Sequence, residues 1–205
     1  MSPLFEITLQ QLLLRFVGAV IILGFHGFVL AWLASFLGDA GPRHDGRATL
    51  SPVPHLGTLG TLGLLLLQVG WVKPLLLSPV EMRRPRLDPW LLALGALATL
   101  VMLILALKLI RQPLLFILPE QTGFFVLRLV NLTVELTLWF LVVNILPLPP
   151  LTGGYALLGL WPLRASRTRQ LSLVTGGALL VLAALGWLQP LLQPLVDTLN
   201  NWLLG

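Results

Sequence analysis

One side chain inside a long apolar stretch could do chemistry, the imidazole of His26. A neutral imidazole is a common metal ligand, and a catalytic zinc ion needs three protein ligands plus one open position. The other side chains able to complete such a set are scattered along the chain, at His44, His55, Asp39, Asp45 and Glu135. His44 and Asp45 are typical of solvated loop surface, and we expect His55 to hydrogen-bond to the backbone of its loop. We therefore expect no bound zinc, no other metal site and no cofactor.

A second group of polar side chains lies within another apolar stretch: Arg128, Asn131 and Glu135. Their spacing places them on one face of a helix. Ionisable groups inside a membrane span are costly, so they usually face protein or water. One hypothesis is a proton or ion path, another is a docking surface for a second subunit, and a third is pairing between helices of this chain. We favour pairing or docking, because one pair of charges does not make a relay chain.

The third feature is a stretch that no regular helix can accommodate, residues 144–154. It holds an asparagine, three prolines and two glycines, namely Asn144, Pro147, Pro149, Pro150, Gly153 and Gly154. Each proline removes a backbone donor, and the glycine pair loosens the chain. Within a membrane, such backbone survives only where protein or a water-filled cavity surrounds it. The sequence therefore predicts a buried, non-helical cleft at membrane depth.

The composition indicates the class of protein that must position these residues. Hydrophobic residues make up 57% of the chain and charged residues 10%, and the mean hydropathy is +0.92. These values exclude an ordinary soluble domain. The chain has no cysteine, which excludes disulfides and thiol nucleophiles. The formal charge of +5 reports membrane orientation here, and we expect no nucleic-acid partner. We also expect no removable signal peptide, because no basic segment precedes the first apolar run.

The apolar runs predict an all-helical, polytopic membrane protein that forms one domain over residues 1–205. A transmembrane helix needs about 20 residues, and we expect about four of them, at 9–37, 90–107, 123–146 and 171–187. Lys108, Arg111 and Pro113 are expected to end the second helix. Residues 59–77 are interrupted by glycines and by Lys73-Pro74, which favours a re-entrant segment. The tail, 189–205, predicts a C-terminal interfacial helix.

The charged residues give an independent prediction of the topology. If residues 59–77 return to the side they left, the loops at 39–58, 78–89 and 162–170 share one face. That face then holds eight arginines: Arg43, Arg47, Arg83, Arg84, Arg86, Arg164, Arg167 and Arg169. The opposite face keeps only Lys108 and Arg111 as basic residues. Because positive residues favour the cytoplasmic side, we expect the basic loops in the cytoplasm and both termini outside it.

Four stretches carry motifs that occur together in one protein family. Residues 144–154 read Asn-Ile-Leu-Pro-Leu-Pro-Pro-Leu-Thr-Gly-Gly, 46–55 read Gly-Arg-Ala-Thr-Leu-Ser-Pro-Val-Pro-His, and 70–74 read Gly-Trp-Val-Lys-Pro. The fourth stretch is 30–39 and includes Leu30-Ala31 and Leu37-Gly38-Asp39. In their order and separation over residues 24–160, these stretches resemble the short bacterial branch of the site-2 proteases, which are intramembrane zinc metallopeptidases.

The resemblance implies a zinc site that is degenerate in this chain. The family's His-Glu-x-x-His pattern supplies two zinc ligands and a base that takes a proton from zinc-bound water, and a later Asp completes the ligands. The first ligand position is His26, which is retained. The base position is Gly27, the second ligand position is Leu30 and the third is Thr152, so two ligands and the base are missing. We expect His26 to hydrogen-bond across helices to the region of Thr152.

These losses favour a membrane protein that keeps the site-2 protease fold but acts by binding. We expect a catalytically inactive accessory or scaffold subunit, or an assembly factor, of a larger complex such as a respiratory or photosynthetic assembly. Its partners would be other membrane protein subunits and the lipid bilayer, in a bacterial inner membrane. Two alternatives remain. One is an intramembrane metallopeptidase with a nonstandard site around His26. The other is a small transporter or channel that uses Arg128 and Glu135.

Overall fold

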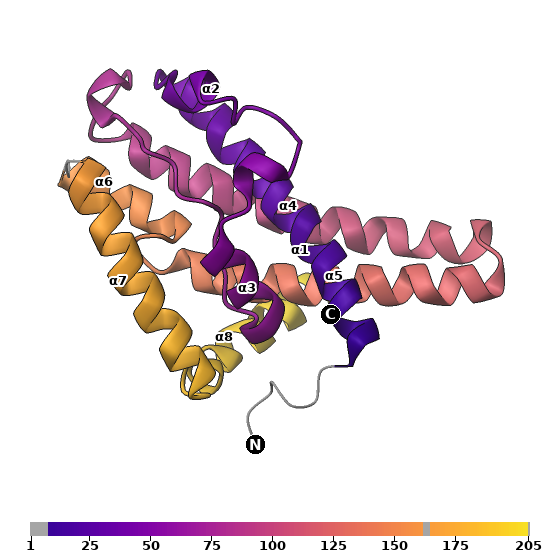
Figure 1. Ribbon diagram of the computed structural model, residues 1–205. Helices are drawn as coiled ribbons and strands as arrows, with labels where there is room; N and C mark the ends of the chain where they lie inside the picture. Colours follow the sequence, from indigo (N-terminus) through magenta and orange to yellow (C-terminus); the bar gives the residue numbers. More distant parts are fainter. Residues whose placement is uncertain (1–7, 162–164, 205) are drawn as a thin grey trace.

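The structure, a computed structural model, describes residues 8–161 and 165–204 of the chain (Figure 1). Every regular element in these residues is helical. The longer helices are α1 (Leu9–Leu37), α4 (Asp88–Ile117), α5 (Glu120–Ile145), α7 (Ala165–Ala184) and α8 (Leu188–Leu204). Short helical turns lie in the connections: α2 (Gly41–His44), η2 (Val53–His55), α3 (Thr58–Leu67), η3 (Pro79–Glu81), η4 (Thr152–Ala156) and α6 (Leu157–Leu160). The predicted all-helical fold is therefore confirmed for the described residues.

Three helices of the described chain, α1, α4 and α5, are long and apolar enough to cross a membrane. α7 and α8 pass the same test only as a pair, and they meet at an angle of 88°. That pair supplies one further span at most. The apolar helices support a polytopic membrane protein, whereas the expected total of four spans stays a prediction.

The ends of α1 follow from local sequence signals. At its start, the hydroxyl of Thr8 accepts a hydrogen bond from the backbone N–H of Gln11, and the Gln11 side chain accepts one from the N–H of Thr8. This reciprocal capping box satisfies donors that a helix N-terminus leaves free. At its end, Gly38 adopts a φ of 116°, a left-handed conformation that glycine reaches without strain. The helix bounds agree with the predicted 9–37.

α4 is longer than the sequence predicts, which corrects the expected end of the second span. The helix continues through Lys108, Arg111 and Pro113, and α5 begins shortly afterwards at Glu120. Lys108 and Arg111 do not interrupt the helix, because both side chains are exposed. Lys108 Nζ donates to the carbonyl oxygen of Leu203, 3.2 Å away. An internal proline removes one backbone hydrogen bond, which a long membrane helix tolerates. The tip of the α4–α5 hairpin projects beyond the rest of the molecule (Figure 1).

The core forms where α1, α4 and α5 meet. Ile22, Leu100 and Phe140, one from each helix, are completely buried there. A Cβ atom added to Gly18 of α1 would lie 2.9 Å from Oγ1 of Thr133 on α5. A glycine therefore lets these two backbones approach closely, as small residues do between membrane helices.

Residues 59–77 form a helix followed by an extended return. α3 has ten residues, so it spans only about 15 Å, half of the about 30 Å of a bilayer core. Gln68 turns the chain with a φ of 60°, and the backbone N–H of Lys73 then donates to the carbonyl oxygen of His55, 2.8 Å away. The chain thus comes back to the level at which α3 began. This geometry fits a re-entrant segment, and its placement in a membrane stays a prediction.

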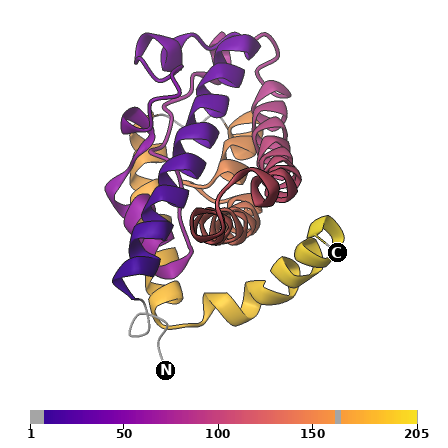
Figure 2. The same cartoon turned by 90° about the vertical axis from the view of Figure 1, so that its right-hand side faces the viewer.

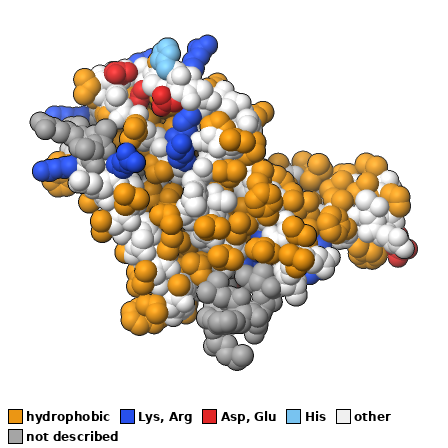
Figure 3. Space-filling model, viewed as in Figure 1, with side chains coloured by type: hydrophobic (Ala, Val, Ile, Leu, Met, Phe, Trp, Pro, Cys, Tyr) orange, Lys and Arg blue, Asp and Glu red, His pale blue; other side chains and the backbone are white. Residues whose placement is uncertain are grey.

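The loops that were predicted to be basic gather at one end of the molecule, where Figure 3 shows most of the visible Lys and Arg side chains. The N–H of Ser78 donates to the Asp39 carboxylate at 2.7 Å, and the N–H of Arg83 donates to the carbonyl oxygen of Leu37 at 3.0 Å. Two of the arginines assigned to the last loop, Arg167 and Arg169, instead lie within α7, which begins earlier than predicted; Arg164 lies outside the described residues.

α8 covers one end of the helical bundle. It runs beneath α4 and α5 and away from α7 (Figure 2). Leu192 and Val196 are buried against the bundle, whereas Leu191 and Trp202 are exposed. The tail is therefore a helix, as predicted, and its location at a membrane interface stays a prediction.

Candidate functional site

Two of the positions singled out by the family resemblance meet directly. His26 on α1 and Thr152 at the start of η4 are both buried, and Nε2 of His26 lies 2.8 Å from Oγ1 of Thr152. The Thr152 hydroxyl and backbone N–H both donate to Oδ1 of Asn144, each at 3.1 Å. Because the hydroxyl proton goes to Asn144, Oγ1 of Thr152 accepts from Nε2–H of His26, which assigns the tautomer. The expected hydrogen bond across helices is confirmed.

Asn144 holds this network to the surrounding backbone. It lies near the end of α5, and its side-chain amide donates to the carbonyl oxygens of Gly70 at 3.0 Å and Phe140 at 2.8 Å. Its side chain therefore joins α5, the return after α3 and η4. All of these groups are neutral, and within the described residues each polar side-chain atom of the network has a partner except Nδ1 of His26, which is buried without one. Buried polar groups that are paired in this way make a local structure specific.

The proline- and glycine-rich stretch positions Thr152 by folding back on the end of α5. A Cβ atom on Gly153 would lie 2.5 Å from the carbonyl oxygen of Ile145, and one on Gly154 would lie 2.7 Å from that of Leu148. Only glycine permits such close approach of two backbones. The predicted break at 144–154 is narrower in the structure. Residues 146–151 are non-helical, whereas Asn144 and Ile145 still belong to α5 and residues 152–154 form the start of η4.

The prolines of this stretch differ in burial. Pro150 is buried, Pro149 is partly buried and Pro147 is exposed. Pro150 also borders a cavity of about 380 Å³ between α3, the extended return that follows α3, and α7. The buried part of the stretch is therefore filled by protein, and the open space lies to one side of it.

The space beside Gly27 is occupied by another side chain. A Cβ atom added to Gly27 would lie 2.4 Å from Cγ and Nδ1 of His55. Nε2 of His55 donates to the carbonyl oxygen of Thr49 at 2.9 Å, which is the predicted loop-to-backbone bond. Burial lowers the pKa of His55 below its ordinary value of 6.5; the hydrogen bond to Thr49 opposes this shift, and the nearby Arg47 adds to it.

No feature of the sequence predicts that His55 lies beside Gly27. The family motif contains a histidine at this position but assigns it no ligand role. Its contact with Gly27 joins a loop to the middle of α1, and no spacing within one sequence reports such a contact.

The residues at the ligand positions do not fit a catalytic zinc ion. His26 and Thr152 are in direct hydrogen-bond contact, and zinc in proteins is bound by Cys, His, Asp or Glu side chains rather than by a threonine hydroxyl. Leu30 is completely buried and offers no donor. No group of three His, Cys, Asp or Glu side chains that could hold a metal ion occurs in the described part of the chain. One imidazole and one hydroxyl remain, fewer ligands than a zinc centre uses.

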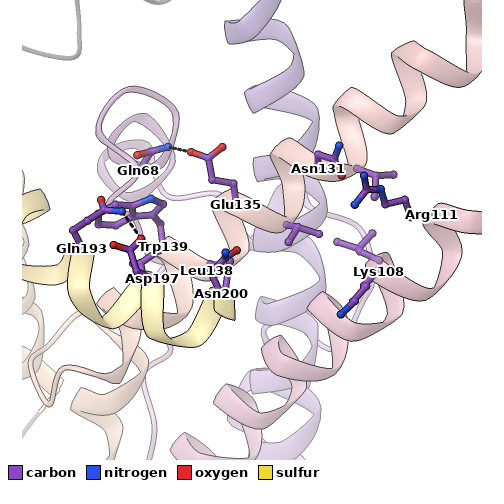
Figure 4. A pocket seen from close by; sticks show the side chains of 14 residues that line it. Gln68, Lys108, Arg111, Asn131, Glu135, Leu138, Trp139, Gln193, Asp197 and Asn200 are labelled. Carbon is purple, nitrogen blue, oxygen red and sulfur yellow. Dashed lines mark hydrogen bonds between the residues drawn. The ribbon is translucent and has the colours of Figure 1, made fainter. Parts of the chain in front are cut away.

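The polar face of α5 binds other elements. Oε1 of Glu135 accepts from the Gln68 side chain at 2.9 Å, and Arg128 donates to the Gln10 side chain at 3.4 Å. Asn131 lines a cavity together with Glu135 (Figure 4). Arg128 and Glu135 thus interact with α1 and with the turn after α3, and no ion pair between the two is found among the described residues.

Comparisons with known proteins give one relative. No protein-family model and no solved structure matches the chain. The chain is similar to a protein of Bacillus subtilis (strain 168) named "Putative zinc metalloprotease YwhC", with 28% identity over 137 residues. The match covers 62% of this chain and 60% of that protein, so the chain spans less than two thirds of the relative's length. This similarity supports the site-2 protease-like relationship that the four motifs indicate.

Proposed function

We propose that this chain is a catalytically inactive site-2 protease-like membrane protein that acts by binding. Its role would be that of an accessory or scaffold subunit, or an assembly factor, of a larger complex in a bacterial inner membrane. A respiratory or photosynthetic complex would be the host. The basic loops would then face the cytoplasm.

The observation that carries the proposal is the hydrogen bond between His26 and Thr152. Hydrolysis at a zinc centre needs a metal-bound water and a base to take its proton. The retained imidazole uses Nε2 in its hydrogen bond to Thr152 at 2.8 Å, and only Nδ1 keeps a free lone pair among the described residues. One free nitrogen supplies a single ligand, where a catalytic zinc ion needs three. A carboxylate base at position 27 would have to displace the ring of His55. A neutral hydrogen-bond network around His26 therefore lies where the family would have its zinc ligands and its base.

The residues that shape the fold around His26 are still present. Their presence favours a binding role over a complete loss of function. Asn144 still joins α5, the return after α3 and η4 through its amide, and Gly153 and Gly154 still allow the close turn. A chain that only needed to lose activity had no reason to keep this buried framework. A chain that must present a defined membrane surface to a partner would keep it.

The experiment is a mild-detergent purification of the full chain from its native membrane, with mass spectrometry of co-purifying subunits and elemental analysis of zinc on one sample. We expect a stoichiometric membrane protein partner. We also expect less than about one zinc ion per ten chains, because a resident ion would be present at about one per chain. The His26→Ala variant is the matched control. Stoichiometric zinc that is lost in this variant, with no partner present, would overturn the proposal in favour of a nonstandard metallopeptidase.

A further inference from the structure

A polar cavity lies apart from the His26 network, between α4, α5 and α8 (Figure 4). Its volume of about 520 Å³ falls in the range of about 300–1,000 Å³ that is typical of small-molecule sites. Six of its polar side chains matter for what it could bind: Gln68, Lys108, Arg111, Glu135, Gln193 and Asp197. They come from four separate parts of the chain, and the cavity exists only in the folded protein.

The two cations of the cavity lie together on α4. Lys108 and Arg111 are one turn apart, so they share one face of this helix. Figure 4 shows both on the side of the cavity away from Glu135 and Asp197. Lys108 Nζ donates to one backbone carbonyl oxygen, and neither cation forms an ion pair in residues 8–161 and 165–204. Such a pair of cations beside apolar helices favours an anionic group between them.

The two carboxylates lie on the other side, each held by a glutamine. Glu135 Oε1 accepts from Gln68 at 2.9 Å, and Asp197 Oδ1 accepts from Gln193 at 2.8 Å. A carboxylate has about four acceptor sites on its two oxygens, so each keeps capacity for another donor. Both side chains are exposed to the cavity. A compact cation with several N–H donors would satisfy both.

The charges are therefore separated, with cations at one side and carboxylates at the other. A zwitterion with a phosphate and a primary ammonium group matches this arrangement. The fork of Arg111 suits a phosphate, and Lys108 adds a second charge-assisted donor. An ammonium group supplies three N–H donors for Glu135 and Asp197.

The surroundings of the cavity favour a lipid over a soluble zwitterion. Leu105 and Leu109 on α4 and Leu195 on α8 are exposed, and the helices that bear the cavity include two of the membrane-spanning candidates. A small soluble zwitterion would leave this apolar exterior uncovered. The acyl chains of a lipid would lie against it while the head group entered the cavity.

We propose that this cavity binds the head group of an amine-bearing zwitterionic phospholipid, of the phosphatidylethanolamine class. Lys108 and Arg111 bind the phosphate, and Glu135 and Asp197 accept hydrogen bonds from the ammonium group. The proposal does not depend on whether the His26 region is catalytically active, since the two sites share no residue.

The experiment is native mass spectrometry of the full chain in nanodiscs of equal parts phosphatidylethanolamine, phosphatidylcholine and phosphatidylglycerol. We expect retention of phosphatidylethanolamine above the other two, because a choline head group has no N–H for Glu135 and a glycerol head group has no cation. Lys108→Gln combined with Arg111→Gln should weaken retention by about tenfold, the loss of charge-assisted hydrogen bonds. Glu135→Gln combined with Asp197→Asn should abolish the preference over phosphatidylcholine while leaving phosphate binding.

Matched variants separate binding from folding. Arg128→Gln removes an exposed cation of α5 that does not line the cavity, so the retention of the three lipids should be the same as in the wild type. Arg111→Lys keeps the charge but loses the fork, so its retention should lie between that of the wild type and that of the double glutamine variant. Thermal unfolding of each α4 variant in detergent checks that it is folded. Equal retention of the three lipids by the wild type would overturn the proposal, as would an unchanged preference in the Glu135 and Asp197 variant.

A further arm separates a lipid from a free head group. Soluble glycerophosphoethanolamine is added at the same concentration to the chain in detergent. We expect binding at least about tenfold weaker than that of the lipid, because the acyl chains contribute apolar burial. Equally tight binding of the soluble compound would overturn the lipid as the ligand. Proton flux in liposomes that Glu135→Gln removes, without any lipid preference, would overturn it in favour of a transport path.

Discussion

The ring of His55 fills the space that any side chain at position 27 would need, since a Cβ atom on Gly27 would lie 2.4 Å from two of its atoms. His55 is itself fixed by its hydrogen bond to the carbonyl oxygen of Thr49. The absence of a base at position 27 is therefore built into the packing of a loop against α1. Restoring a glutamate there would require the loop to move as well.

Gly27→Ala should destabilise the protein by about 1–3 kcal/mol, because the added methyl group overpacks a closed site. Thermal unfolding of the purified protein in detergent would measure this. Gly177→Ala is the matched control. Gly177 lies in α7 with no atom within 4 Å of an added Cβ, so this change should be neutral or stabilise by up to about 1 kcal/mol.

The same prediction has a second part that isolates the contact. If the clash is with His55, Gly27→Ala should cost little more when His55→Ala is already present. A double-mutant cycle measures this difference. Additive effects of the two substitutions would show that the ring of His55 is not what Gly27 accommodates.

Thr152→Val should also destabilise the protein, by about 1–3 kcal/mol, because it leaves Nε2–H of His26 buried without an acceptor. Valine has nearly the shape of threonine, so packing changes little. Replacing both partners, with His26→Leu in addition, should restore part of the loss, since no donor is then left unpaired. Unfolding measurements on the two single variants and the double variant would test this. A double variant as unstable as the sum of the single ones would contradict the hydrogen bond.

Much of the helical fold could be predicted from the sequence. The features that could not be predicted depend on contacts between residues far apart in the chain. The bounds of α1 follow from a capping box and a C-terminal glycine, which are local signals. The pairing of His26 with Thr152 could be inferred only from the family resemblance. The end of α4 was missed because Lys108 and Pro113 act as stop signals in a soluble helix, whereas here a carbonyl oxygen of α8 receives the lysine.

The residues that line the polar cavity also could not be grouped from the sequence. Glu135 stood out from the sequence as an ionisable residue in an apolar helix, but its neighbours did not. Asp197 lies in the tail and Lys108 at an expected helix end, and only the packing of α8 beneath α4 and α5 brings them together. A single sequence contains no signal for contacts of this range.

Stability should depend on pH through His55, whose burial lowers its pKa below the ordinary 6.5. The unfolded chain then binds a proton more readily than the folded one. The stabilisation is fully present above pH 6.5 and is lost as the pH falls below it towards the folded pKa. The unfolding temperature should therefore fall between pH 8 and pH 5, and it should fall less in His55→Gln. An equal fall in both proteins would mean that His55 carries no such shift.

The topology can be tested directly because the chain has no cysteine, so each introduced cysteine is unique. Ser51 and Val80 are exposed and flank the segment formed by α3 and its extended return. If this segment re-enters on the side it left, Ser51→Cys and Val80→Cys should react with a membrane-impermeant maleimide from the same side, which the positive-inside rule makes the cytoplasmic one. In inside-out vesicles the reagent should then label both cysteines, and in intact cells it should label neither.

Gln121→Cys at the exposed tip of the α4–α5 hairpin provides the control, and it should show the opposite pattern. Labelling of Ser51→Cys and Val80→Cys from different sides would mean that residues 59–77 cross the membrane, and the arginines of the basic loops would then be divided between its two faces.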